Sequence, residues 1–129
     1  MRIGEAAAAT GATTKTLRFY EQARLLQPAE RTPSGYRRYD PDVVERVHFI
    51  RRGQAAGLTL AEIRTILEIR DAGHAPCRHV EKLLGDRLDA IDRQVAELHQ
   101  LRATVAALHR AASEAEPDGC PPETICRYL

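Results

Sequence analysis

Apolar residues recur every three or four positions along most of this chain, which predicts a mainly α-helical protein. The repeat is clearest over residues 43–50 and 60–67, and Gly57 separates these two stretches. The residues expected on the buried sides are Val43, Val44, Val47, Phe49 and Ile50, then Leu60, Ile63, Ile66 and Leu67. Helix-start signals precede both stretches, namely a cap at Asp40 with Pro41 in the first helical position, and a capping box of Thr59 with Glu62. We therefore expect two consecutive helices that pack in a compact head.

The same repeat continues over one much longer stretch, after Asp71-Ala72-Gly73-His74-Ala75-Pro76 interrupts it. A helix is predicted from about residue 76 to about residue 112, with apolar positions at Leu84, Leu88, Ile91, Val95, Leu98, Leu101, Val105 and Leu108. A single helix of this length cannot bury such a stripe alone, so it needs a partner. We expect self-association through a coiled coil, and the alternative is that the helix folds back onto the head.

The N-terminal residues carry the signals of a helix-turn-helix. Alanines favour a short first helix, Gly11 breaks it, and either Thr13 or Thr14 can cap a second helix. Lys15 and Arg18 lie three residues apart, so they share one face of that second helix. A short basic face rich in hydroxyls is what a helix entering the DNA major groove requires. The alternative is an ordinary helical pair with a solvated basic face.

A turn signal follows at Pro33-Ser34-Gly35, between basic and aromatic residues. We interpret this segment as a small hairpin, or wing, whose guanidinium groups and tyrosine hydroxyl suit phosphate oxygens. The alternative is a basic surface loop. The predicted organisation is therefore a DNA-binding head over 1–71 (helix-turn-helix about 3–22, wing about 31–39), a dimerisation helix over 76–112, and a tail over 113–129.

The overall charge excludes a protein that coats nucleic acid through general basicity. The 129 residues include 19 Lys and Arg against 18 Asp and Glu, a net charge of +1, so DNA binding must come from a local patch. The first 70 residues supply the patch, with Arg2, Lys15, Arg18, Arg24, Arg31, Arg37, Arg38, Arg46, Arg51, Arg52, Arg64 and Arg70. Apolar runs are too short to span a bilayer and the first residues do not resemble a signal peptide, so we expect a cytoplasmic protein with no membrane partner.

Four motifs combine with the long helix: Arg2-Ile3-Gly4-Glu5, Thr16-Leu17-Arg18-Phe19-Tyr20-Glu21, Gly35-Tyr36-Arg37-Arg38-Tyr39, and Gly57-Leu58-Thr59-Leu60 with Glu62-Ile63. Together they resemble the MerR family of bacterial transcription regulators, over essentially the whole chain. The resemblance implies a winged helix-turn-helix head and a homodimer joined by an antiparallel coiled coil. It also implies that the dimer binds double-stranded promoter DNA between the two hexamers read by RNA polymerase. With its effector bound, such a dimer activates transcription by bending and untwisting the spacer.

The same resemblance places Lys15, Arg18, Tyr20, Tyr36 and Arg37 at positions that contact DNA. With the hydroxyl, basic and turn residues beside them, the full predicted contact set is Thr13, Thr14, Lys15, Arg18, Tyr20, Arg31, Ser34, Gly35, Tyr36, Arg37 and Arg38.

Three cysteines are the candidate sensor, because an odd number cannot close a complete set of disulfides within one chain. Cys77 stands at the start of the long helix, where a helix N-terminus favours the thiolate, and Cys120 and Cys126 lie in the tail. The resemblance implies that a cysteine at the position of Cys77 accompanies divalent ions and reaches the tail loop of the other subunit. Three thiolates suit a soft ion, with Hg²⁺ preferred and Cd²⁺, Pb²⁺ or Zn²⁺ as alternatives. Zn²⁺ would need a fourth ligand, from His74, His79 or a water.

The tail departs from the family pattern. Metal-sensing relatives carry another loop cysteine seven to nine residues before the position of Cys120, where this chain has Ala111, Ala112 and Ser113. Three interpretations of Cys126 follow: it is the third ligand, the site is two-coordinate without it, or it packs as a small hydrophobe in a short terminal helix near Ile125 and Leu129.

Two other functional classes would use the same cysteines. A redox sensor would use Cys120 and Cys126 as a switchable pair and would keep the DNA-binding function. An enzyme with Cys77 as nucleophile and His79 as base is disfavoured, because residues two apart on a helix point away from each other. We therefore expect a regulator and no enzyme.

Overall fold

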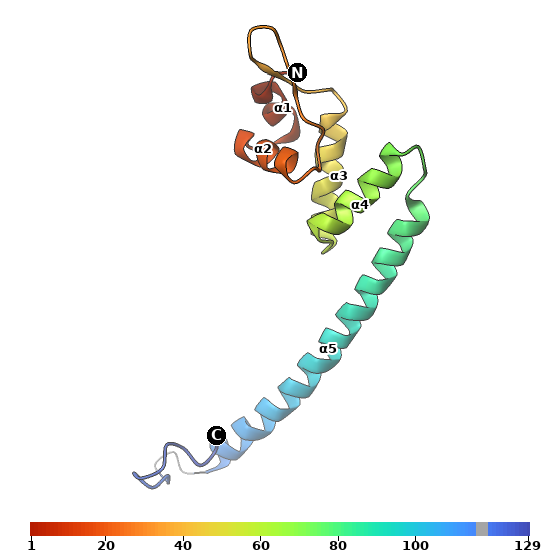
Figure 1. Ribbon diagram of the computed structural model, residues 1–129. Coiled ribbons are helices and arrows are strands. Elements are labelled where there is room, and N and C mark those ends of the chain that lie inside the picture. The colour runs from red at the N-terminus through yellow and green to blue at the C-terminus, as the bar shows by residue number, and fades with distance from the viewer. Residues whose placement is uncertain (116–118) are drawn as a thin grey trace. The chain divides into compact units, whose positions relative to one another are not determined.

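The computed structural model describes residues 1–115 and 119–129, and for Arg37 it describes the backbone alone. Along these residues the elements are α1 (Ile3–Thr10), α2 (Thr14–Gln22), β1 (Glu30–Arg31), β2 (Arg37–Arg38), α3 (Val43–Ala55), α4 (Leu60–Asp71) and α5 (Cys77–Glu114) (Figure 1). The predicted fold class, a mainly helical chain with a winged helix-turn-helix and a long C-terminal helix, is confirmed. The chain forms two units, Met1–Arg87 and Leu88–Leu129, and α5 runs through both.

The helix-turn-helix is set by small and hydroxylated residues at the helix ends. Thr10 is buried, and its hydroxyl bonds backbone groups on both sides of the turn. Gly11 has a φ of +72°, a left-handed conformation that glycine adopts without steric cost. Thr13, rather than Thr14, caps α2, because its Oγ1 accepts a hydrogen bond from the amide of Thr16 at 3.1 Å.

The wing is an antiparallel hairpin of β1 and β2, in which Glu30 pairs with Arg38. Its turn closes where the Gly35 amide donates to the Thr32 carbonyl at 2.8 Å, and Gly35 has a φ of +84°. Arg2 forms a β-bridge with Arg38, so the start of the chain lies alongside β2. The predicted hairpin is confirmed, and the N-terminus supports its base.

One apolar core holds the head together. Its buried members are Ala6, Ala12, Leu17, Tyr20, Leu25, Leu26, Tyr39, Val43, Val47, Ile50, Leu58, Ile63, Ile66 and Leu67. Burying each large aliphatic side chain of this kind contributes about 1.5–3 kcal/mol. Gly53 allows α3 and α4 to approach closely, because a Cβ at this position would lie 2.9 Å from the Ile63 side chain. The predicted buried side of α3 is confirmed at Val43, Val47 and Ile50, whereas Val44 and Phe49 are half-buried.

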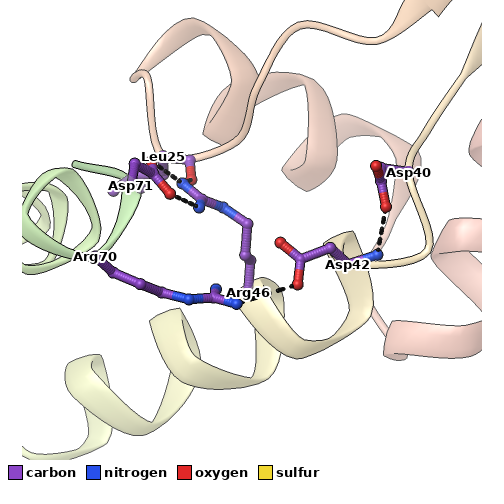
Figure 2. A network of polar contacts seen from close by, with 6 residues as sticks. All are labelled: Leu25, Asp40, Asp42, Arg46, Arg70 and Asp71. Atoms are coloured by element: carbon purple, nitrogen blue, oxygen red, sulfur yellow. Dashed lines mark hydrogen bonds and ion pairs between the residues drawn. The ribbon is translucent and has the colours of Figure 1, made fainter. Parts of the chain in front are cut away.

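The predicted start of α3 was wrong by two residues. The Asp40 carboxylate accepts from the amide of Asp42 at 2.9 Å, which makes a turn in front of the helix (Figure 2). Asp42 is the N-cap residue and Val43 begins α3, so Pro41 lies in the turn and not in the first helical position. At α4, by contrast, the predicted capping box of Thr59 and Glu62 is confirmed, with bonds of 2.9 and 3.1 Å.

Three helices end with the same hydrogen-bond pattern. At the end of α3 the Leu58 amide donates to the Gly53 carbonyl at 3.0 Å, and the intervening Gly57 has a φ of +81°. The end of α4 repeats this around Gly73, and the end of α2 repeats it around Arg24, whose φ is 61°. Arg24 is thus a non-glycine residue at a position that glycine usually occupies.

The long helix α5 spans 38 residues and carries a stripe of exposed apolar side chains. No helix of the described residues is long and apolar enough to cross a membrane. The predicted short terminal helix is wrong for residues 119–129, which form turns and bends. Pro121 and Pro122 lack amide donors, and the few residues after them are too short for a stable isolated helix.

Candidate DNA interface and metal ligands

One face of α2 is exposed, basic and rich in hydroxyl groups. The predicted contact residues on it are Thr13, Thr14, Lys15 and Arg18, and all four are exposed. The opposite face buries Leu17 and Tyr20 in the core. Packing therefore fixes the helix and leaves its polar face free to face a ligand.

The prediction omitted Phe19, an aromatic residue on the exposed side of α2. Its side chain is 49 % exposed, and it follows Lys15 by four residues, which places the two on one helix face. An exposed apolar ring on a groove-facing helix suits contact with a thymine methyl group. In the sequence, its spacing from Lys15 already places it on the same helix face as that residue.

Tyr20 does not belong to the exposed face. Its ring is 5 % exposed, and its hydroxyl donates to Oε1 of Gln54 on α3 at 3.3 Å. Tyr20 therefore lies at the junction between α2 and α3. Its contact with DNA stays a prediction, and it would have to be made by the hydroxyl group, because the ring is buried.

The wing presents the remaining predicted contacts. Its exposed members are Arg31, Ser34, Gly35, Tyr36 and Arg38, and the side chain of Arg37 lies outside the described part of the structure. The Tyr36 ring is 56 % exposed, and the Arg2 guanidinium lies 4.8 Å from its centroid in a cation–π contact. Arg2 therefore adds a positive charge to the wing that the contact set did not include.

Glu21 ties α2 to the base of the wing. Its Oε1 accepts from the amide of Ala29 at 2.6 Å, and its Oε2 accepts from the hydroxyl of Tyr39 at 3.0 Å. Ala29 directly precedes β1, and Tyr39 directly follows β2. The Glu21 carboxylate therefore joins the end of α2 to a residue beside each strand of the wing. The α2 face and the wing are thereby held in a fixed relation.

Several arginines of the predicted basic patch bond other groups of the head. Three of them donate to backbone carbonyls around the helix-turn-helix: Arg46 to Leu25 at 3.0 Å, Arg51 to Thr10 at 3.0 Å and Arg64 to Ala23 at 3.1 Å. Arg70 pairs with Asp42 at 3.4 Å. Arg46 is buried and therefore does not belong to an exposed basic patch, whereas Arg51 and Arg70 stay exposed beside their contacts within the head.

The three cysteines are free thiols. Cys77 is the first residue of α5 and is exposed, Cys120 is half-buried, and Cys126 is exposed. Residues 1–115 and 119–129 of the single chain contain no group of three His, Cys, Asp or Glu residues placed to hold a metal ion. Ile125 and Leu129 are almost fully exposed, so the packed interpretation of Cys126 has no support within one chain.

The tail also places a cation beside its thiols. The Arg127 guanidinium donates to the Tyr128 hydroxyl from Nε at 3.0 Å and from Nη2 at 2.8 Å. These hydrogen bonds raise the pKa of Arg127 above its ordinary value, and the charges of Tyr128, Cys120 and Cys126 add to the effect. An arginine guanidinium is protonated at neutral pH in any case, so the segment that holds two of the three thiols also carries a positive charge.

Comparison with known proteins decides the family. Residues 1–69 match the family described as MerR HTH family regulatory protein, and residues 44–108 match the one described as MerR, DNA binding. The chain belongs to the MerR family. A probable heavy metal-dependent transcriptional regulator of Haemophilus influenzae is 37 % identical, over 78 % of this chain and 79 % of that protein.

Two further MerR-family relatives cover more of the chain. The mercuric resistance operon regulatory protein of Bacillus cereus is 35 % identical, over 88 % of this chain and 86 % of its own length. The transcription regulator PbrR691 from Ralstonia metallidurans CH34, solved in complex with lead(II), superposes with a TM-score of 0.76 at 32 % identity, covering 97 % of this chain and 91 % of that chain. The chain is therefore a transcriptional regulator with metal-responsive relatives, and not an enzyme.

Proposed function

We propose that this MerR-family regulator binds promoter spacer DNA as a homodimer and activates RNA polymerase when a soft divalent metal ion is bound. One observation carries the proposal: a single chain combines the exposed face of α2 and the wing with three free thiols. Its relatives support the same assignment, since they include regulators named for heavy metals and for mercuric resistance.

The proposed DNA contacts divide into two kinds. Lys15, Arg18 and Phe19 on α2 would face base edges in the major groove. There, basic side chains recognise guanine by paired hydrogen bonds, and apolar groups recognise the thymine methyl. The wing, with Tyr36 and Arg38, would contact phosphates and fix the register of the head on the duplex. Thr13, Thr14, Arg31, Ser34, Gly35 and Arg37 complete the proposed interface.

Cys77, Cys120 and Cys126 are the proposed metal ligands. Thiolates are soft donors, so the set fits Hg²⁺ by preference, with Cd²⁺, Pb²⁺ or Zn²⁺ as alternatives. Within one chain the described residues hold no three-residue cluster, so the proposed site takes Cys77 from one protomer and the tail thiols from its partner. Bound metal supplies a fixed point between the subunits, and the thiolates supply the charge that retains it.

The redox alternative would join Cys120 and Cys126 in a switchable disulfide. It is the less favoured candidate, because the relatives with metal in their names cover most of this chain. Anaerobic metal titration, set against peroxide treatment of the same sample, separates the two.

Replacing each cysteine by serine tests the proposed ligands. Apo operator binding should stay nearly unchanged, because none of the three lies on the α2 face or the wing. Cys77→Ser and Cys120→Ser should abolish the Hg²⁺ response in an in vitro transcription assay. Loss of a residue that only supports a metal ligand typically lowers metal affinity by roughly 10–100-fold. If Cys126 is itself a ligand, Cys126→Ser should lower Hg²⁺ affinity by more than this. Thiolate-to-metal charge-transfer absorption should fall with it.

Mixed dimers provide the matched control. A Cys77→Ser chain combined with a Cys120→Ser chain should regenerate one complete site in each heterodimer. Verified heterodimers that recover no Hg²⁺ binding would show that the site lies within one chain. A Cys126→Ser variant with native Hg²⁺ affinity would remove Cys126 from the ligand set.

A further inference from the structure

A buried arginine joins the end of α4 to the end of the helix-turn-helix. The Arg46 side chain, on α3, is 8 % exposed. Figure 2 shows its guanidinium reaching both Asp71 and Leu25. Its Nη1 donates to Oδ1 of Asp71 at 2.8 Å, and its Nη2 donates both to the Leu25 carbonyl at 3.0 Å and to Oδ2 of Asp71 at 3.3 Å. One guanidinium therefore bridges two segments that lie 46 residues apart in sequence.

The chemistry of this bridge makes it stiff. The Arg46 Nε is buried and has no hydrogen-bond partner among the described residues, so the two Nη atoms make all of its polar contacts there. Asp71 is the carboxylate that compensates the buried guanidinium, and moving it away would leave that buried cation without its counter-charge. Displacement of Asp71 should therefore draw Arg46 with it.

One end of the bridge lies close to Cys77, a proposed metal ligand, and the other end lies at the end of α2, the proposed DNA-contacting helix. Asp71 is the last residue of α4, and only five residues separate it from Cys77 at the start of α5. Leu25 closes the turn that ends α2, where its amide donates to the Tyr20 carbonyl at 2.9 Å. The path from Cys77 to α2 thus runs through a short connection, one ion pair and one backbone turn.

The surroundings leave room for movement. Asp71 is 39 % exposed, and Arg46 and Asp71 both line a hollow of about 620 Å³ that opens beside the base of the wing. A neighbouring pair, Arg70 and Asp42, lies at the surface with side chains 45 % and 43 % exposed. It joins α4 to α3 without reaching the helix-turn-helix, so it is a matched control.

We propose that Arg46 and Asp71 are positioning residues that couple the connection between α4 and α5 to the recognition helix α2. This inference rests on the proposed function, because it assigns a route by which metal binding at Cys77 would reach the DNA-binding surface. The contact between Arg46 and Asp71 does not require metal. The coupling and the proposed metal-sensing function can therefore be tested in separate experiments.

The first experiment needs neither metal nor DNA. Hydrogen exchange is measured by mass spectrometry on the full-length native chain, Asp71→Asn and the control Asp42→Asn. Amides in the segment from Tyr20 to Leu26 should exchange several-fold faster in Asp71→Asn and at the native rate in Asp42→Asn. Equal exchange of this segment in the native chain and Asp71→Asn would overturn the link.

The second experiment measures coupling, with Hg²⁺ as the probe. Asp71→Asn should bind the operator without metal and bind Hg²⁺ with near-native affinity, whereas the fold-activation of transcription by Hg²⁺ should fall toward onefold. Asp71→Glu, which restores a carboxylate in a roomy site, should recover part of the activation. Native activation in Asp71→Asn would overturn the coupling role.

A third variant guards against misfolding, because Asp71→Asn can lower the melting temperature. Arg46→Lys keeps the buried charge but cannot present two Nη groups to Leu25 and Asp71 together. It should lose activation in the same way, and native activation in Arg46→Lys would also overturn the proposal. If the native chain itself gives no response to Hg²⁺, Cd²⁺, Pb²⁺ or Zn²⁺, the proposed function fails, and the exchange experiment still decides the link.

Discussion

Arg24 occupies a backbone conformation that glycine normally fills. It follows α2 with a φ of 61°, at the position that Gly57 and Gly73 hold after α3 and α4. A left-handed conformation costs a residue with a side chain roughly 1–2 kcal/mol, because Cβ approaches the following carbonyl oxygen. The Arg24 side chain is exposed to solvent.

Arg24→Gly should therefore stabilise the head. We expect the free energy of unfolding to rise by about 1 kcal/mol, since relief of strain exceeds the added flexibility of the unfolded chain. Thermal and urea unfolding at one fixed protein concentration measures this. Gly73→Ala is the control, because a Cβ there meets nothing within 4 Å while φ is +88°, so it should destabilise through backbone strain alone. A less stable Arg24→Gly would mean that the arginine side chain stabilises this turn.

At the scale of elements, one face of α2 packs in the core of the head, and the opposite face is exposed for the proposed contact with DNA. Leu17 and Tyr20 hold it in the core, and Lys15 and Arg18 stand on the exposed face. Substitutions on the exposed face should therefore alter DNA binding without altering folding.

Lys15→Ala and Arg18→Ala test this division. Each should weaken operator binding by about 1–3 kcal/mol if it contacts bases, and a phosphate contact should also lower the salt dependence. Fluorescence anisotropy over several salt concentrations measures both quantities. Arg102→Ala, an exposed position on α5, removes the same charge far along the chain from α2 and should bind like the native protein. Native affinity in both α2 variants would exclude this face from the interface.

Much of this element structure follows from local sequence signals. The cap at Thr13, the turn at Gly35 and the capping box at Thr59 each depend on residues within a few positions, so they were predictable. The partners of the arginines were not predictable, because Arg46 and Arg51 bond carbonyls that lie 21 and 41 residues away. Charge patterning along a sequence cannot distinguish a guanidinium that faces solvent from one that satisfies a distant helix end.

The candidate sensor shows the same division between local and distant information. Cys77 at the first position of α5 was predictable from the proline before it and the long apolar repeat after it. Which thiols meet rests on the family resemblance alone, which predicts that Cys77 joins the tail thiols of a second copy of the chain. Sequence spacing within one copy carries no information about that meeting.

At the scale of the whole molecule, the exposed stripe on α5 predicts association. Its side chains from Leu84 to Leu108 are between 38 % and 64 % exposed in the single chain, which is unusual for so many large apolar residues on one helix. A second copy of the same helix is the partner that we propose.

Leu98→Asp should dissociate the dimer, because it places a charge within the apolar stripe. Analytical ultracentrifugation at micromolar concentration should give a dimer for the native chain without metal and a monomer for the variant. Operator affinity should fall with it, since each monomer reads one half-site. Gln100→Asp, on the opposite face of α5, should remain dimeric. A monomeric native chain would contradict the proposed assembly.

The arginines that bond within the head also bear on how such a regulator finds its operator in a genome. Affinity for arbitrary DNA depends on the number of phosphates that solvent-facing cations neutralise. Arg46 is buried and Arg64 is half-buried, each bonded to a carbonyl of the head, and the chain as a whole has a net charge of only +1. We expect short residence on unrelated sequences, a shallow salt dependence there, and a search made of many brief encounters rather than long sliding.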